Sequence, residues 1–221
     1  MPGYQREYVR DTDQVEQLLK DVREEMGDGA AQEAPEYFIG SIVVCPGRDG
    51  VFDLIDGQQR MTTLYITLCA IRDRLAELGA PTSSVLNAQI ADAAVDVSGE
   101  EHRRYRLDLQ YEDSGDALIH LAVGKPIETP STQSMRNMQN AHHVVTRFLD
   151  SEFGQDPAAV RKLYGYLTNK VKLIRIQTED LAKALKIFET INDRGVGLNS
   201  MDLLKNLLFM KTPKGQFDRL K

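Results

Sequence analysis

Apolar residues recur at helical spacing over much of the chain, and this spacing predicts that helices dominate the fold. Two helices also carry start signals: Asp156-Pro157 pairs a capping residue with a proline at the first helical position, and Asn199 or Ser200 precedes an apolar run. The helices are expected over 13–26, from Gln58 to near Gly79, and over 114–124, 131–151, from Pro157 onward, 180–191 and 199–210.

Two of these helices have specific features that a structure can check. In the first helix, Asp13 is the expected N-cap, with Glu16 three residues later. Its apolar face is expected to hold Val15, Leu18, Leu19, Val22 and Met26. The core face of the helix after Gly57 is expected to hold Met61, Leu64, Tyr65, Leu68, Ile71 and Leu75.

A second pattern, of apolar runs and strict alternation, predicts a few strands. The runs at 37–45 and 51–57 flank the turn "PGRDG" and read as a β-hairpin. Further strands are expected at 104–110 and 172–177. The stretch 81–101 is small and polar, so we expect an insertion or mobile loop with at most a short helix. The predicted fold class is therefore α+β.

Composition is ordinary for a globular protein and adds limits rather than a function. The 221 residues are 42% hydrophobic and 27% charged, and no apolar run approaches the roughly 20 residues that cross a bilayer. The start "MPGYQREYVRD" lacks an apolar leader, so a cytoplasmic protein is expected. Cys45 and Cys69 lack metal-ligand spacing and are expected to be buried thiols. We expect an α/β core over 1–125, with 126–221 completing the same domain.

The net charge of −6 argues against a chain that coats nucleic acid nonspecifically, because such binding needs many Lys and Arg contacts to phosphate. Two local basic segments remain. The segment 160–177 holds five basic residues, no acidic residue and two tyrosines, and "HRRYR" occupies 102–106. Each is more often a solvated surface than a DNA contact, so both give only weak support for DNA binding.

Several enzyme classes leave no trace in the sequence. A Walker-type phosphate loop is missing, and "GVGLNS" at 195–200 lacks the third glycine and the preceding strand of a dinucleotide site. The four histidines form no zinc-binding motif, so no zinc site held by the protein alone is predicted. No G-x-S-x-G elbow points to a serine hydrolase.

The stretch "FDLIDGQQRMTTLYITL" at 52–68 places polar side chains at a strand-to-helix corner. The first amides of a helix are unpaired and carry a partial positive charge, so a phosphate fits there. Gly57 would let a ligand approach the backbone, Arg60 could hold a phosphate through two N–H bonds, and Asp56 could orient Arg60, a water or a metal ion. The competing interpretation is a helix capped by Asp56, with Arg60 paired to it. Spacing alone leaves both open.

Two other stretches have a similar character: "INDRGVGLNS" between two predicted helices, and "YQREY" before the first one. Taken with "FDLIDGQQRMTTL", and in this order, they resemble the N-terminal domain of GmrSD-type modification-dependent restriction proteins. The relatives of that family include phosphorothioate-sensing Ssp defence proteins. The resemblance runs from about Tyr4 to Met210. It implies a ParB/sulfiredoxin-like fold, with a small mixed sheet, helices and a helical C-terminal extension. Arg10 departs from the family, where many relatives have Trp.

The resemblance also implies that the D-G-Q-Q-R segment binds and hydrolyses a nucleoside triphosphate, with Mg²⁺ expected. We assign catalysis to Asp56, Gln59 and Arg60, with Asp56 as the one possible metal ligand. The positions expected to bind nucleotide are Gln5, Arg6, Tyr8, Gly57, Gln58, Thr62, Thr63, Asn192 and Arg194.

The resemblance therefore implies a regulatory NTPase domain of an antiviral restriction system, with modified phage DNA as the expected partner. Family members usually continue into a His-Asn-His nuclease, whereas no histidine follows His143 here. We therefore expect the nuclease to be a separate polypeptide or a further part of a longer chain. Homo-oligomerisation is left open. Alternatives are a DNA-modification sensor or scaffold that binds phosphate without catalysis and, more weakly, a phosphotransferase.

Overall fold

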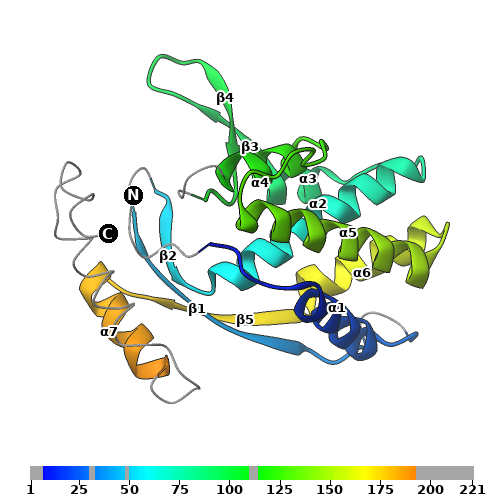
Figure 1. The fold of residues 1–221 in the computed structure, drawn as a ribbon, viewed down its shortest axis with the longest axis horizontal. Coiled ribbons are helices and arrows are strands. Elements are labelled where there is room, and N and C mark those ends of the chain that lie inside the picture. Colours follow the sequence, from blue (N-terminus) through cyan, green and yellow to red (C-terminus); the bar gives the residue numbers. More distant parts are fainter. Residues whose placement is uncertain (1–6, 30–32, 48–49, 110–113, 193–221) are drawn as a thin grey trace. The chain divides into compact units, whose positions relative to one another are not determined.

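The computed structural model describes residues 7–29, 33–47, 50–109 and 114–192. Figure 1 shows that helices dominate this part of the chain, as the apolar spacing predicted. Its helices are α1 (Thr12–Met26), α2 (Gln58–Glu77), α3 (Ser84–Ile90), α4 (Ser114–Ala122), α5 (Gln133–Phe153), α6 (Pro157–Asn169) and α7 (Leu181–Asn192). Its strands are β1 (Tyr37–Pro46), β2 (Phe52–Asp56), β3 (Ala91–Val95), β4 (Glu101–Tyr105) and β5 (Val171–Gln177).

The predicted α+β class is confirmed, and most predicted elements are found within one or two residues of their expected bounds. The helix expected at 199–210 lies outside the described residues. No helix in the described ranges is long and apolar enough to cross a membrane.

Helix α1 has its N-cap two residues earlier than the sequence suggested. Its N-cap is Asp11, whose carboxylate accepts the backbone N–H of Gln14, and the Gln14 side chain returns to the backbone of Asp11. The prediction of Asp13 as N-cap was wrong: Asp13 lies inside the first turn of the helix, and Asp11 forms the reciprocal pair with Gln14. The expected apolar face is otherwise buried, although Leu18 is only partly covered.

Helix α2 is buried on more sides than an amphipathic pattern suggests. Tyr65, Ile71 and Leu75 are buried as expected, whereas Met61, Leu64 and Leu68 keep intermediate exposure. In their place the helix buries Thr62, Thr63, Ile66, Thr67, Cys69, Ala70 and Arg74. The predicted core face was therefore partly wrong. A helix enclosed on most sides lacks the single apolar stripe from which such a face is inferred.

The chain divides into two compact units. The residue ranges of these units differ from the division that was expected near residue 125. The first unit comprises 1–7, 40–58 and 173–221, and the second comprises 8–39 and 59–172.

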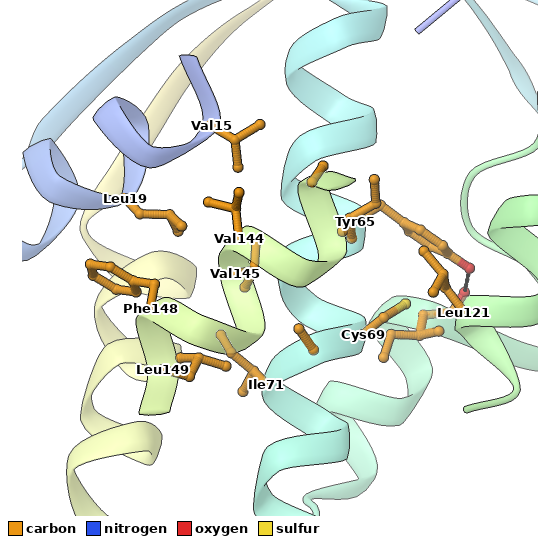
Figure 2. Packing of buried hydrophobic residues seen from close by; sticks show 14 of the residues in the cluster. Val15, Leu19, Tyr65, Cys69, Ile71, Leu121, Val144, Val145, Phe148 and Leu149 are labelled. Atoms are coloured by element: carbon orange, nitrogen blue, oxygen red, sulfur yellow. Dashed lines mark hydrogen bonds between the residues drawn. The ribbon is translucent and has the colours of Figure 1, made fainter. Parts of the chain in front are cut away.

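The second unit has the larger apolar core. Figure 2 shows residues of α1, α2, α4 and α5 pointing toward one another, including Val15, Tyr65, Leu121 and Val145. The polar end of Tyr65 is satisfied inside this core, because its hydroxyl donates to the carbonyl of Ile90 over 2.9 Å. Cys69 belongs to the same core, and burial raises the pKa of its thiol to about 12.

The first unit holds most of a three-stranded sheet with the order β2-β1-β5. Strands β1 and β2 are antiparallel, as the hairpin prediction required, with an irregularity between Val43 and Val44. The core of this unit forms where α7 contributes Ala184 and Leu185 against Val43, Cys45 and Ile55. Both cysteines are buried free thiols, as predicted.

A second hairpin occupies much of the stretch that was expected to be a loop. Strand β3 pairs antiparallel with β4, and Ala91 lies opposite Tyr105. Figure 1 shows this hairpin extending away from the helices of its own unit. The strand predicted at 104–110 lies earlier, at β4. The short helix allowed within 81–101 is α3, whereas the prediction of a mobile loop was wrong for β3. The sequence "ADAAV" has weak strand propensity, so its conformation depends on the cross-strand partner.

Candidate functional site

The strand-to-helix corner requires glycine for two reasons. Strand β2 ends at Asp56, Gly57 adopts a φ of +90°, and α2 begins at Gln58. A Cβ on Gly57 would lie 2.5 Å from Cγ2 of Ile42 and 3.3 Å from the carbonyl oxygen of Ser41. The sequence suggested that this glycine admits a ligand. In the structure, the position of its missing side chain is occupied by the neighbouring strand, which explains the glycine without a ligand.

The first turn of α2 retains the features of an anion site. It contains no acidic residue, so no carboxylate there offsets the positive end of the helix dipole. The Gln58 amide donates to the carbonyl of Leu54 over 2.9 Å, which fixes its side chain on the corner. Roles for Asp56, Gly57 and Gln58 in nucleotide binding or catalysis stay predictions.

Hydrogen bonds hold the N-terminal segment against α2 and α5. The Tyr8 N–H donates to Oγ of Ser134 over 3.0 Å, and Asn137 Nδ2 donates to the Tyr8 carbonyl over 3.0 Å. The Tyr8 hydroxyl shares a 3.0 Å bond with Oγ1 of Thr63. The Val9 N–H donates to Oε1 of Gln59 over 2.9 Å. Tyr8 therefore lies beside Gln59 and Thr63, although it is far from them in the sequence. All three were among the predicted site residues.

These contacts indicate how the three residues contribute. Tyr8 is 1% exposed and Thr63 is fully buried, with its hydroxyl also donating to the Gln59 carbonyl over 2.8 Å. Thr62 is buried as well. The hydrogen bonds described for these side chains are to the protein itself, so the geometry favours a role in positioning the N-terminal segment. Direct nucleotide binding by these residues stays a prediction.

Beside this junction lies a pocket of about 600 Å³ within the second unit, lined at one end by Arg10 and Arg60. Nη1 of Arg10 is buried and has no hydrogen-bond partner among the described residues. Burial lowers the pKa of the Arg10 guanidinium and the charge of Arg60 lowers it further, whereas Tyr8 raises it. Two guanidiniums near each other, one with an unsatisfied buried N–H, form a site suited to an anion.

Arg10 was not among the residues predicted to bind nucleotide. The sequence showed it only as an arginine in the extended segment before α1. Arg10 is recognised as a candidate because it lies close to Arg60 in space, although Arg60 is fifty residues later in the chain. Sequence spacing alone does not predict this proximity.

The rest of the pocket wall comes from one side of α1 and the start of β1. Asp13, Gln14, Gln17, Leu18 and Asp21 line it from the helix. From the strand come Tyr37, Phe38 and Ile39. The pocket therefore combines a cationic end with polar and aromatic side chains.

The side chains of four other predicted positions are not described by the structure. Gln5, Arg6 and Arg194 lie outside the described residues, and Asn192 is the last residue of α7, with its side chain not described. No group of three or more His, Cys, Asp or Glu side chains that could hold a metal ion occurs in the described ranges. A metal role for Asp56 stays a prediction.

The basic segment 160–177 is less suited to nucleic acid than its composition suggested. Tyr166 is fully buried and donates to the carbonyl of Pro35, so it offers no ring for base stacking. Lys162 donates to the carbonyl of Gly27, and Lys172 pairs with Glu36 at 3.5 Å. Arg175 lies over the Phe52 ring, 5.2 Å from its centroid. Much of this positive charge is thus engaged locally.

A comparison with family models matches residues 1–209 to the family described as "GmrSD restriction endonuclease, N-terminal domain". A comparison with curated proteins gave no match. The family match covers all three stretches from which the resemblance was drawn.

Proposed function

The chain belongs to the GmrSD restriction endonuclease N-terminal domain family, and we propose that it is the nucleotide-binding and nucleotide-hydrolysing regulatory domain of its restriction system. Membership assigns the chain a role in DNA restriction. The family acts on modified DNA, and a nuclease domain is normally attached. Nucleotide binding, hydrolysis and control of the nuclease are the proposed steps.

The pair of guanidiniums in the pocket carries this proposal. The charges of Arg10 and Arg60 repel each other, and the buried N–H of Arg10 loses its hydration without gaining a partner among the described residues. A phosphate oxygen between Arg10 and Arg60 would satisfy that N–H and offset both charges. Guanidinium groups bind phosphate through paired N–H bonds, which makes a triphosphate the best-matched ligand class.

The pocket also fits the metal ion that accompanies a triphosphate. Mg²⁺ is usually held by one or two carboxylates together with phosphate oxygens, so it needs no cluster of protein ligands. Asp13 lines the same pocket as the two arginines and supplies one such carboxylate. When bound, the ion would neutralise charge on the phosphates.

Hydrolysis would depend mainly on positioning and electrostatics, as phosphoryl transfer generally does. A water oxygen bonds to the γ-phosphorus while the bond from that phosphorus to the β–γ bridging oxygen breaks. Arg60 and Arg10 would stabilise the charge that develops on the phosphate oxygens. Asp56 and Gln59 are the proposed groups that orient the water, and Gln59 is held in place through its bond to Val9.

The hydrogen-bonded junction suggests how nucleotide occupancy could reach a nuclease. Arg10 belongs to the N-terminal segment, whereas Arg60 belongs to the first turn of α2. A phosphate bound to both would add a link between two elements that already meet through Tyr8 and Thr63. Binding and release would therefore strengthen and weaken this junction.

The test measures nucleotide affinity and phosphate release for ATP, GTP, CTP and UTP with Mg²⁺, with and without modified DNA. We expect at least one nucleotide to bind and to be hydrolysed. Arg60→Ala should abolish both activities, whereas Arg161→Ala, which removes an exposed arginine on α6, should leave them unchanged. A folded protein that neither binds nor hydrolyses any of the four would refute the proposal. Loss of DNA binding in Arg60→Ala without any nucleotide affinity would favour the phosphate-binding sensor instead.

A further inference from the structure

We propose that the end of the pocket away from Arg10 binds the ribose of the nucleotide through Asp21, so that the site selects ribonucleotides over 2′-deoxyribonucleotides. This inference rests on the proposed nucleotide binding. It adds which part of the ligand the remaining wall of the pocket recognises.

The direction of the pocket follows from α1. Gln14, Gln17 and Asp21 are three and four residues apart in turn, so they share one side of the helix. Arg10 precedes the N-cap of the same helix. From Gln14 to Asp21 the helix rises roughly 10 Å, at about 1.5 Å per residue. A triphosphate that begins at the arginines and runs along this side would bring its sugar near Asp21.

Asp21 is held ready as an acceptor. Gln17 Nε2 donates to its Oδ1 over 2.6 Å, and the Tyr37 hydroxyl donates to its Oδ2 over 3.2 Å. An ionised carboxylate offers about two acceptor sites on each oxygen, so both oxygens keep capacity for another donor. Burial and the nearby Asp21 charge raise the pKa of Tyr37, which keeps its hydroxyl protonated and donating.

The negative charge of Asp21 determines which part of the ligand can bind at this end of the pocket. Asp21 repels phosphate, whereas vicinal hydroxyls donate well to a fixed carboxylate, as they do in dinucleotide-binding folds. Phe38 follows Tyr37 in β1, lines the same pocket and is 55% exposed, so an aromatic surface is available next to the sugar for a base. The order along the pocket is therefore phosphate at Arg10 and Arg60, ribose at Asp21 and base toward Phe38.

The experiment compares dissociation constants of the four ribonucleoside triphosphates, their 2′-deoxy forms and inorganic tripolyphosphate by calorimetry. The wild-type chain should bind the preferred ribonucleotide about tenfold more tightly than its deoxy form, the expected effect of one hydrogen bond to a charged group. In Asp21→Asn this ratio should fall to about one, while tripolyphosphate binding stays within about twofold of wild type. Glu24→Gln, an exposed carboxylate on α1, is the matched control and should change neither.

The outcomes separate this inference from the function on which it rests. Equal affinity of the wild-type chain for both sugars, with nucleotide binding intact, would overturn the ribose assignment alone, whether or not any variant folds. An equal loss of tripolyphosphate binding in Asp21→Asn would also overturn it, because the carboxylate would then act on the whole ligand. Absence of both nucleotide and tripolyphosphate binding would overturn the proposed function itself.

Discussion

Arg72 and Arg74 on one side, and Arg10 on the other, show the same side chain in contrasting environments within the second unit. Arg72 and Arg74, in the second half of α2, are largely buried and surrounded by acceptors. Arg74 donates to the carbonyl of Gly154 and pairs with Asp150, both over 2.7 Å, and only its Nε lacks a partner. Arg72 donates to carbonyls at the end of α4 and pairs with Asp73.

Arg10 meets a different environment. Burial and the nearby charge of Arg60 lower the pKa of its guanidinium, Tyr8 raises it, and its Nη1 has no partner in the described part of the chain. An arginine whose N–H groups bond to acceptors of the protein itself contributes to the stability of the fold. An arginine that buries an unsatisfied N–H beside a like charge is kept at a cost to stability, which is a frequent sign of a functional site.

The largest effect is expected from Arg60→Ala on ligand binding. Loss of a charged, paired contact to phosphate should weaken nucleotide binding about 100-fold, equivalent to roughly 2.7 kcal/mol. Titration calorimetry with the preferred nucleotide measures this change, and Arg161→Ala serves as the control. A loss of less than about threefold would mean that Arg60 does not contact the ligand.

Arg74→Ala should act on stability instead. The substitution leaves the Gly154 carbonyl and the Asp150 carboxylate without their donor, so the free energy of unfolding should fall by about 2 kcal/mol. Denaturant unfolding measures it, and nucleotide affinity of the folded variant should be unchanged. Wild-type stability in this variant would show that the acceptors around Arg74 do not matter, and the contrast with Arg10 would fail.

Arg10→Gln should have the opposite effect to Arg74→Ala: nucleotide affinity should fall, whereas stability should not. Nucleotide affinity should fall about tenfold, because one charged contact to phosphate is lost. The free energy of unfolding should stay the same or rise by up to about 1 kcal/mol, since a side chain with one buried, unsatisfied N–H is removed. A clear loss of stability together with unchanged affinity would assign Arg10 to the fold.

The smallest effect concerns pH and the cluster around Arg72. Burial lowers the pKa of His142, the neighbouring Asp73 raises it, and His143 and Arg72 lower it. The unfolded chain therefore binds a proton that the folded chain resists, so the free energy of unfolding should fall as the pH drops below about 6.5. One proton limits the slope to about 1.4 kcal/mol per pH unit.

His142→Gln should remove this part of the pH dependence, whereas His143→Gln, at an exposed neighbour, should leave it in place. Burial raises the pKa of Asp73, so its protonation opposes the loss at still lower pH, where the folded chain takes up the extra proton. An unchanged pH profile in His142→Gln would show that the burial of this imidazole does not affect stability.

Much of the fold could be predicted because its signals are local. Asp156-Pro157 marked the start of α6, and the apolar runs on either side of "PGRDG" marked β1 and β2. The missed features depend on partners elsewhere in the chain. The alanine-rich β3 needs β4 opposite it, and the core face of α2 depends on neighbours that enclose it on most sides.

The candidate site divides in the same way. The D-G-Q-Q-R corner was visible because glycine, amides and arginine follow one another at a helix start. Arg10, Asp21 and Tyr37 were not, because their grouping depends on how α1 packs beside β1 and the start of α2. The sequence alone indicated the chemistry of the corner. The second arginine and the rest of the pocket were found only from the packing of the structure.

The central claim is that Arg10 and Arg60 hold the same anion, and a double-mutant cycle on nucleotide affinity tests it most directly. Dissociation constants are measured for the wild-type chain, Arg10→Gln, Arg60→Gln and the double variant. Two side chains that share one phosphate group should couple, so the double variant should lose less affinity than the sum of the single losses, by about 1 kcal/mol. Strictly additive losses, or single variants with wild-type affinity, would contradict the account.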